Sequence, residues 1–295
     1  MNALRHLYTG KVRDLYEVSS DMLLMVASDR MSAYDVVINE PIPNKGRVLT
    51  GLTDYWIHEF AREVPTSLLS SDPLVIEDYV ADFAQHPTWA GRAMLVRRAE
   101  MIPLECIVRG RLAGQAYEEY VRSGTVHGAT IATGMRLSDP FAEPIFTPST
   151  KADAGHDRNI DLAEAASIVG ASTLERAQTL CLDLFSRAAA RLESVGIVLA
   201  DTKFELGFID SELVFCDEVL TPDSSRLWPA ESVRSGETPP SLDKQPFRDW
   251  LDTLHWDRTP PAPRVPPAVI AETEARYVSA YERVSGRLLR DWYGA

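Results

Sequence analysis

The segment from residue 197 to residue 208 constrains the fold more than any other part of the chain. It begins with an apolar run, after which charged residues occupy every second position. Side chains two positions apart share one face of a strand, so the segment predicts a strand with one apolar and one charged face. The charged face would carry Asp201, Lys203 and Glu205, and the apolar face would carry Phe204, Leu206 and Phe208. Two carboxylates around one ammonium are costly to bury, so the pattern indicates a site.

A second strand is expected to return toward this charged face. Residues 210–212 have the composition of a turn, and residues 213–216 are apolar. If the loop holds three residues, Glu205 and Asp217 lie directly opposite each other, close enough to share a cation. Two carboxylates with room for water and phosphate oxygens suit Mg2+, which favours a metal–nucleotide site. A solvated face, with ion pairs worth only ~0.2 to 1 kcal/mol, fits the spacing equally well.

Composition favours a cytoplasmic protein with two or three lobes. At 295 residues and 45% hydrophobic the chain can bury a large core, and it exceeds the usual size of one domain. No apolar run approaches the ~20 residues that span a bilayer, and no signal-peptide stretch is expected. A net charge of -13 argues against nucleic acid and anionic membranes as partners. The scattered Cys106, Cys181 and Cys216 fit neither a disulfide framework nor a zinc site, so each is expected to be a small buried hydrophobe.

A basic motif lies near the start of the chain. Residues 8–16 predict a strand, a glycine turn and a second strand, with Lys11 and Arg13 on one face and Val12 on the other. Gly10 would let the backbone approach a ligand closely, and the two cations could then grip phosphates. Taken by itself, the segment favours an ordinary hairpin with solvated charges, and it is neither a Walker A loop nor a GxGxxG motif.

Two more segments carry candidate ligand-binding residues. Apolar strands at 94–98 and 104–108 lead into Arg109-Gly110-Arg111, just before a helix that runs through residue 120. Arginines beside a glycine at a helix entrance could form a phosphate pocket, and a surface arginine pair is equally compatible. Residues 144–160 are small and polar, which predicts a long mobile loop that could close over a ligand.

Apolar spacing predicts helices that build the scaffold. The expected helices cover residues 48–61, 173–195 and 268–292. Ser172 and Glu175 would form a capping box at the start of the second helix, and Gly196 would end it. The proline-rich residues 259–267 predict a semi-rigid tether before the last helix.

The motifs follow one order along nearly the whole chain. They are Gly10-Lys11-Val12-Arg13, Ser28-Asp29-Arg30 with Ser32 and Asp35, Pro103-Leu104-Glu105 with Arg109, Ser149-Thr150-Lys151 with His156-Asp157, Asp201-Thr202-Lys203-Phe204-Glu205-Leu206-Gly207, Asp217-Glu218, and Pro222-Asp223-Ser224-Ser225-Arg226-Leu227-Trp228. The ordered set closely resembles the phosphoribosylaminoimidazole-succinocarboxamide synthase (SAICAR synthetase) family. Two positions depart from the pattern of that family: Gln115 stands where serine is typical, and Arg158 stands where glutamate is frequent. Gln115 can still donate a hydrogen bond to a phosphate.

The resemblance implies an ATP-dependent ligase of purine biosynthesis. Such an enzyme joins the carboxylate of carboxyaminoimidazole ribonucleotide (CAIR) to the amine of L-aspartate and releases SAICAR, ADP and phosphate. A carboxylate is a poor electrophile until it is phosphorylated, so the resemblance implies an acyl phosphate and a Mg2+ ion. A small-molecule kinase with the same ATP lobe is the alternative, and a non-catalytic nucleotide sensor is a third reading.

The fold implied by the resemblance is α+β. An N-terminal antiparallel lobe, similar to the ATP-binding lobe of kinases, would cover residues 1–105. A larger central α/β lobe over residues 106–240 would hold the substrates and metal, and helices in residues 241–295 would pack against the body. The sequence leaves open whether the chain is a monomer or a homodimer.

The resemblance also implies a role for each motif residue. ATP would bind Gly10, Lys11, Val12 and Arg13, with adenine against the segment that contains Arg98 and Met101. Lys203 and Asp201 would be catalytic, and Glu205 and Asp217 would hold Mg2+. The substrates would bind Ser32, Asp35, Arg109, Gln115, His156, Asp157 and Arg226.

Overall fold

Two sheets organise the computed structural model, which describes residues 4–34, 36–60, 64–151 and 158–293. The first sheet is antiparallel, with its strands in the order β1-β2-β3-β7-β6. These strands are β1 Arg5–Thr9, β2 Arg13–Glu17, β3 Met22–Ala27, β6 Leu68–Ser70 and β7 Ala93–Arg97. Helix α2 (Pro73–Glu77) and the 3-10 turns Phe83–Gln85 and Pro87–Trp89 contribute Ile76 and Phe83 to the small core beside it.

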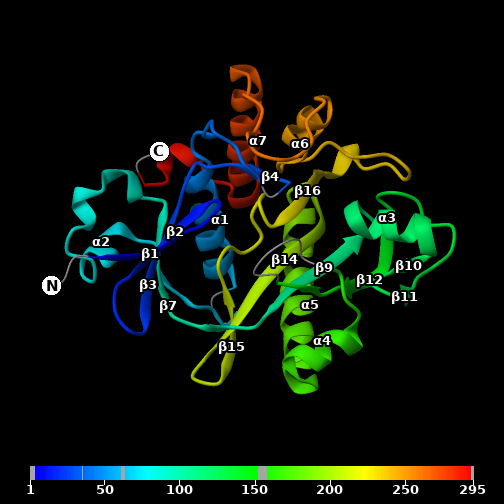
Figure 1. Cartoon of the computed structure of the whole chain (residues 1–295), viewed down its shortest axis with the longest axis horizontal. Helices are drawn as coiled ribbons and strands as arrows, with labels where there is room; N and C mark the ends of the chain where they lie inside the picture. The colour runs from blue at the N-terminus through cyan, green and yellow to red at the C-terminus, as the bar shows by residue number, and fades with distance from the viewer. Residues whose placement is uncertain (1–3, 35, 61–63, 152–157, 294–295) are drawn as a thin grey trace.

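The second sheet contains the strand that the alternating pattern predicts. Its main order is β12-β9-β14-β15, and β8, β13 and β16 pair at its sides. The strands are β8 Glu100–Met101, β9 Leu104–Arg111, β12 Pro140–Phe146, β13 Ser149–Thr150, β14 Ile197–Ile209, β15 Glu212–Cys216 and β16 Ser225–Pro229. Strand β14 pairs with β8, β9, β15 and β16, and Figure 1 shows it running through the middle of the molecule. Phe204 and Leu206 are fully buried, as expected for the apolar face.

Helix α5 (Ala171–Glu193) packs along this second sheet (Figure 1). The predicted apolar stripe is confirmed by the buried residues Leu174, Ala177, Cys181, Leu184, Ala188 and Leu192. The predicted capping box is wrong, because Gly170 caps the helix and Ser172 lies inside its first turn. The preceding helix α4 (Leu162–Val169) ends at the same Gly170, so the chain turns directly from one helix into the next. The helix ends at Glu193, slightly before the predicted end, and Gly196 follows with a left-handed φ of 71°.

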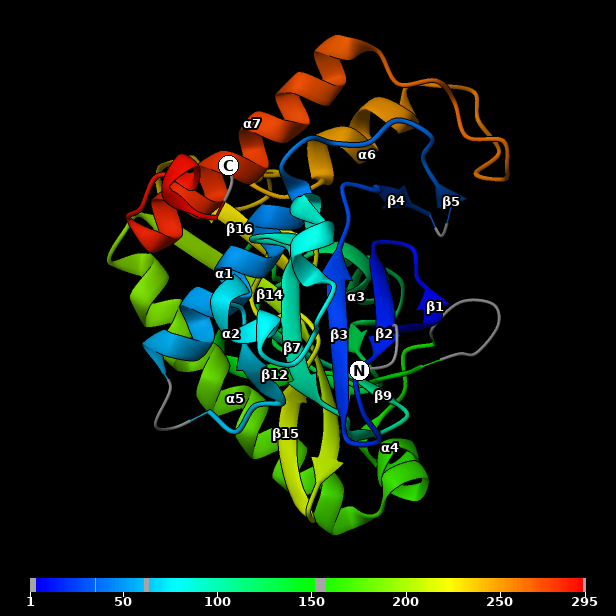
Figure 2. The ribbon, with the colours of Figure 1, turned by 90° about the vertical axis from the view of Figure 1, so that its left-hand side faces the viewer.

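Helices from the two ends of the chain lie together. Helix α1 (Lys45–Glu59) contacts α7 (Pro267–Ser285), and Figures 1 and 2 show α6 (Gln245–Asp252) beside α7. The predicted last helix is too long, because Gly286 takes a left-handed φ of 69° and ends α7. A 3-10 turn, Leu289–Asp291, follows it.

Smaller elements complete the fold. Helix α3 (Gly114–Ser123) precedes the short hairpin of β10 (Thr125–Val126) and β11 (Ala129–Thr130). A second short hairpin is formed by β4 (Ser32–Ala33) and β5 (Val36–Val37).

The hairpin of β14 and β15 differs from the prediction by one residue. Ile209 pairs with Glu212, so the loop holds only Asp210 and Ser211. Both loop residues have positive φ, 49° and 66°, which is the backbone of the two-residue turns that match strand twist. Glu205 therefore lies opposite Cys216, and the predicted pairing with Asp217 is wrong.

Two other sequence expectations are corrected. The end of strand β12 and the short strand β13 lie within the predicted loop at 144–160, and residues 152–157 lie outside the described residues. Arg109 and Arg111 belong to strand β9 instead of a loop at a helix entrance.

The three cysteines are buried and free, as expected, and none of the described helices is long and apolar enough to cross a membrane. The proposed boundaries at residues 105 and 240 stay a prediction.

Candidate active site

The charged face of β14 meets Glu105 from β9 and Lys151, which directly follows β13. Lys203 Nζ lies 2.6 Å from Glu105 Oε1 and 3.1 Å from Glu205 Oε1, and Lys151 Nζ pairs with the other oxygen of Glu205. Burial by itself would lower the pKa of Lys203, but the charges of Glu205 and Glu105 outweigh it and raise that pKa. Burial would raise the pKa of Glu205, yet Lys203 and Lys151 lower it to about 2. The site therefore holds ionised groups at neutral pH.

Arg13 joins the first sheet to this cluster. Its Nη1 lies 3.0 Å from Asp217 Oδ1, and its Nη2 lies 2.9 Å from Glu218 Oε2. Burial raises the pKa of Asp217 to about 6 against the attraction of Arg13, and the negative charges of Glu205 and Glu218 add to the rise. The Oδ1 atom of Asp217 is shielded from solvent, and its contact with Arg13 is an ion pair without hydrogen-bond geometry. Asp217 is thus a half-buried carboxylate whose charge is incompletely compensated.

Glu205 and Asp217 fit a hard divalent cation. Although the strand register separates them, Asp217 leaves β15 with a φ of 56°, and the charge of Glu205 reaches it. A cation would neutralise Oδ1 more fully than the Arg13 ion pair does and would offset the repulsion between the two carboxylates. No group of three His, Cys, Asp or Glu ligands occurs in the part of the chain that is described. Two carboxylates completed by phosphate oxygens match the way in which Mg2+ is held.

A second cluster surrounds Asp201. Arg109 Nη1 lies 3.1 Å from Asp201 Oδ2, and Arg226 Nη1 pairs with the same oxygen. Arg109 is 4% exposed, and its Nε donates to Thr147 Oγ1 at 3.0 Å. The Arg226 guanidinium packs against Gly114, at the start of α3, where a Cβ would collide with it. Two arginines beside a helix N-terminus form an anion-binding arrangement.

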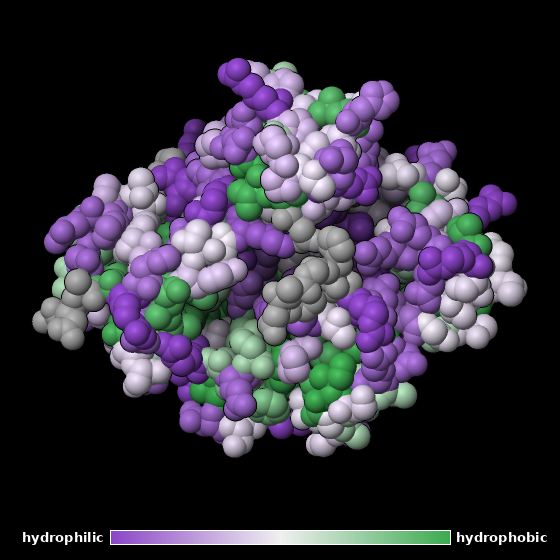
Figure 3. Space-filling view, in the orientation of Figure 1, coloured by the Kyte–Doolittle hydropathy of each residue, from purple (hydrophilic) through white to green (hydrophobic). Residues whose placement is uncertain are grey.

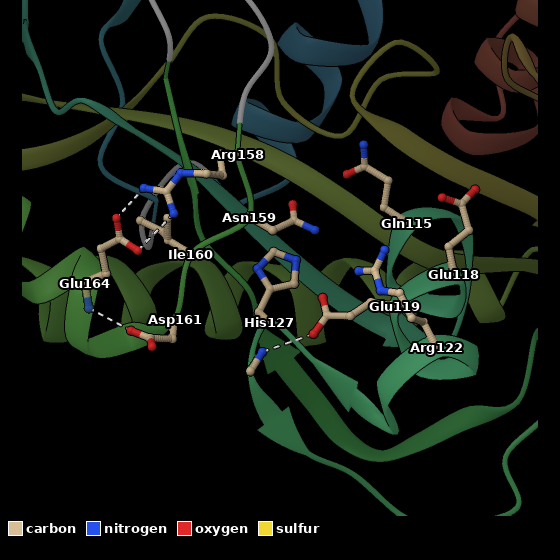
Figure 4. A pocket seen from close by; sticks show the side chains of 11 residues that line it. Gln115, Glu118, Glu119, Arg122, His127, Arg158, Asn159, Ile160, Asp161 and Glu164 are labelled. Atoms are coloured by element: carbon tan, nitrogen blue, oxygen red, sulfur yellow. Dashed lines mark hydrogen bonds and ion pairs between the residues drawn. The ribbon is translucent and has the colours of Figure 1, made fainter.

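Gln115 lines a cavity of about 670 Å3 between α3 and residues 158–164 (Figure 4). Arg158, the other departure from the family pattern, lines the same cavity and is paired with Glu164. His127 Nδ1 lies 3.0 Å from the Pro148 carbonyl, and burial together with the Arg109 charge lowers the pKa of His127. This imidazole is therefore neutral at pH 7, and its Nδ1 donates because a carbonyl can only accept.

The glycine turn of residues 10–12 directly precedes Arg13. Because Arg13 pairs with Asp217 and Glu218, the turn lies near the acids that follow β15. Gly10 N donates to Arg13 O at 2.7 Å, and Ser28 Oγ donates to the Val12 carbonyl at 2.8 Å. Lys11 is exposed at this turn, so it does not share the burial of Arg13. The turn is thus hydrogen-bonded to the start of β2, where Arg13 is buried, while Lys11 is exposed.

The remaining predicted positions are spread around the cleft. Arg98 Nε donates to the Ser20 carbonyl at 3.0 Å, and Met101 is 39% exposed on β8. Ser32 is half-buried on β4. Asp35, His156 and Asp157 lie outside the described residues. Figure 3 shows hydrophilic side chains gathered around a hollow near the centre of the face seen in Figure 1.

Several site residues escaped the sequence interpretation. Lys45 is fully buried, and its Nζ lies 2.6 Å from Asp223 Oδ2, which is 178 positions away in the chain. The Lys244 ammonium forms no ion pair with the described residues, and burial together with the charges of Arg248 and Lys45 lowers its pKa despite Asp223. Glu105 and Lys151 belong to the sequence motifs, but the motifs by themselves assign them no role. The one sequence signal for a role of Glu105 and Lys151 is their place in the motifs Pro103-Leu104-Glu105 and Ser149-Thr150-Lys151.

Comparisons with known proteins agree on one family. The sequence profile described as SAICAR synthetase matches residues 6–263. A phosphoribosylaminoimidazole-succinocarboxamide synthase of Chromobacterium violaceum is 44% identical over 97% of this chain and 100% of its own length. The synthase of the same name from Bordetella pertussis is 47% identical over 93% of both chains.

Solved structures give the same result for the fold. SAICAR synthase from Saccharomyces cerevisiae, solved in complex with SAICAR, superposes with a TM-score of 0.89 at 41% identity, covering 97% of this chain and 96% of that one. A type-2 SAICAR synthetase solved in complex with ADP superposes with a TM-score of 0.70 at 22% identity, covering 95% and 98%. The α+β architecture expected from the sequence is confirmed by these superpositions.

Proposed function

This chain belongs to the SAICAR synthetase family, and from that premise we propose how its own residues perform the reaction. The protein is a carbon–nitrogen bond-forming ligase of purine biosynthesis. It joins the carboxylate of CAIR to the amine of L-aspartate with consumption of ATP, and the products are SAICAR, ADP and phosphate. The comparisons do not favour the alternative of a small-molecule kinase.

The observation that carries the residue assignment is the meeting of both sheets at one acidic cluster. Arg13 from the first sheet lies 3.0 Å from Asp217, whose pKa responds to Glu205 and Lys203 on β14. A phosphate chain placed between the glycine turn and β14 would therefore meet cations and metal-binding carboxylates together. Phosphoryl transfer depends mainly on such positioning and charge neutralisation.

Within this cluster each group has a distinct task. Glu205 and Asp217 would hold Mg2+, whose charge neutralises the ATP phosphates. Lys203, kept protonated by Glu105 and Glu205, steadies the transferring phosphoryl group or the activated carboxylate of CAIR. Gly10 and Lys11, together with Arg13, bind the phosphates from the other side of the cleft.

The adenine would lie against residues 98–101. Arg98, Ala99 and Glu100 line a cavity of about 440 Å3 that also contacts Phe208. Met101 is partly exposed beside it and offers an apolar side chain for a ring to contact. An aromatic base needs this combination of apolar contact and backbone polar groups.

The ribonucleotide would occupy the anion-binding arrangement around Asp201. Arg109 and Arg226 share Asp201 Oδ2, so that carboxylate fixes the direction of both guanidinium groups. Gln115 at the start of α3 adds a neutral donor for a phosphate oxygen. Lys244 adds a cation without an ion-pair partner among the described residues. Ser32, Asp35, His156 and Asp157 remain proposed contacts to CAIR and L-aspartate.

A coupled assay of ADP release tests the reaction. With CAIR and ATP present, ADP should appear at a steady rate only when L-aspartate is added, because the acyl phosphate needs the amine to turn over. Succinate, which lacks the amine, is the matched control and should support no turnover. ADP release that continues with an alcohol substrate and without L-aspartate would contradict the ligase assignment.

A further inference from the structure

The loop of residues 217–224, between β15 and β16, has a strained backbone. Asp217 and Leu220 have φ values of 56° and 55°, a left-handed conformation that is sterically unfavourable for a residue with a side chain. Such a conformation persists only when surrounding contacts determine it. Because Asp217 stands at the start of this loop, the loop backbone decides where its carboxylate points.

Helix α1 supplies two of these contacts. Thr53 Oγ1 accepts a hydrogen bond from Val219 N at 3.3 Å, and Trp56 Nε1 donates to the Leu220 carbonyl at 3.2 Å. Val219 and Leu220 are buried, so water cannot replace these bonds. The helix therefore fixes the strained residue from one side.

The other end of the loop is held by a buried charged triad. Lys45 Nζ lies 2.6 Å from Asp223 Oδ2, and the Tyr277 hydroxyl donates to Asp223 Oδ1. Lys45 and Tyr277 are 0% exposed, and they come from α1 and α7. A buried ion pair is often no more stabilising than apolar residues of the same volume. Its directional bonds instead select one conformation of the loop.

We propose that Lys45, Asp223 and Tyr277 are positioning residues that set the loop geometry with which Asp217 meets magnesium ATP. The inference rests on the proposed function only in taking Asp217 as a magnesium ligand. The triad acts through the backbone between Asp223 and Asp217, because the Lys45 ion pair and the Tyr277 hydrogen bond both lie at Asp223 and not at Asp217. Loss of one directional bond should therefore loosen metal binding while the core stays packed.

The test is a titration of Mn2+ into the full chain with ADP present, read by the electron paramagnetic resonance signal of free Mn2+. Tyr277→Phe should weaken Mn2+ binding by about 3- to 10-fold, because groups that support metal ligands typically have effects of this size or larger. The KM for magnesium ATP should rise in parallel, whereas the KM for L-aspartate should not change. Tyr281→Phe, on the same helix and also buried, is the matched control and should bind Mn2+ like the unmodified chain.

Unchanged Mn2+ affinity in a folded Tyr277→Phe variant would overturn the proposal. If that variant does not fold, Asp223→Asn is measured in the same way and decides it by the same criterion. The variant Asp217→Asn tests separately whether Asp217 is a magnesium ligand, which is the assignment that this proposal takes from the proposed function. If Asp217→Asn binds Mn2+ normally, the metal-ligand role is wrong; if it binds weakly while Tyr277→Phe is normal, only the positioning role is wrong.

Discussion

At the scale of single residues, neighbours decide which buried groups of the cleft stay charged. Lys203 and Glu205 stabilise each other's ionised form, with Glu105 and Lys151 completing the set. Asp217 lacks such a balance, because Arg13 only partly offsets burial and two nearby acids. Asp217 therefore gains more from a divalent cation than Glu205 does.

Lys203→Ala should reduce turnover by at least about 100-fold, the usual cost of removing one charge-stabilising donor from an active site. The fold should survive, because the side chain is 33% exposed and the strand keeps its partners. Arg264→Ala, which removes a side chain that is 95% exposed, is the control for loss of a cation. Steady-state kinetics and circular dichroism check both variants, and normal turnover would remove Lys203 from the mechanism.

Glu205 should make the unfolding free energy of the metal-free chain depend on pH in the acidic range. Its pKa of about 2 in the folded chain lies below the ordinary value of 4.5, so its ionised form stabilises the fold above that ordinary value. The contribution is lost as the pH falls toward the folded pKa. Glu205→Gln should cost about 1 to 3 kcal/mol of unfolding free energy near neutral pH and almost nothing at about pH 2. Urea unfolding with EDTA measures this, and a difference that is constant with pH would contradict it.

At the scale of elements, the turn between β14 and β15 sets the register of the strand that precedes Asp217. Asp210 and Ser211 both have positive φ, so the loop closes with two residues instead of three. That register places Cys216 opposite Glu205 and leaves Asp217 beyond the strand end. Glu205 and Asp217 are therefore not a cross-strand pair, and the left-handed backbone at Asp217 determines where its carboxylate lies.

Ser211→Gly should stabilise the chain by about 0.5 to 1 kcal/mol, because glycine adopts a φ of 66° without steric cost. Ser194→Gly is the matched control, since Ser194 has a φ of -62° and glycine there should destabilise the chain. Thermal unfolding of the two variants provides the comparison. A loss of stability in Ser211→Gly would show that the turn is held by its side chain.

At the scale of the whole molecule, the C-terminal segment packs against the first third of the chain. Trp292 Nε1 donates to the Gly91 carbonyl at 2.8 Å, across 201 positions of sequence, and its side chain is 8% exposed. Helix α1 contacts helix α7, and Figure 2 shows α7 close to the C-terminus. The C-terminal region therefore belongs to the packed body, and it also contributes Tyr277 to the loop that carries Asp217.

Trp292→Ala should destabilise the chain by about 3 to 5 kcal/mol, the usual cost of deleting a buried tryptophan. Tyr293→Ala is the neighbouring control, because its side chain is 40% exposed and should matter by less than about 1 kcal/mol. Urea unfolding curves of both variants give the two values. Equal effects would show that Trp292 contributes little to the packing of the chain end.

Local patterns determined much of the candidate site. The alternation of strand side chains placed Asp201, Lys203 and Glu205 on one face, because a period of two needs no tertiary information. Helical spacing likewise identified the buried stripe of α5. The ordered motifs then indicated the family that the comparisons confirm.

The tertiary structure decided what no local pattern encodes. Backbone conformation at Ser211 fixed the register, and distant packing brought Lys45 to Asp223 and Arg13 to Asp217. Partners so far apart in the chain meet only when the sheets and helices have packed. The sequence by itself therefore specified which charges share a strand face, and only the packed fold determined which opposite charges those groups meet.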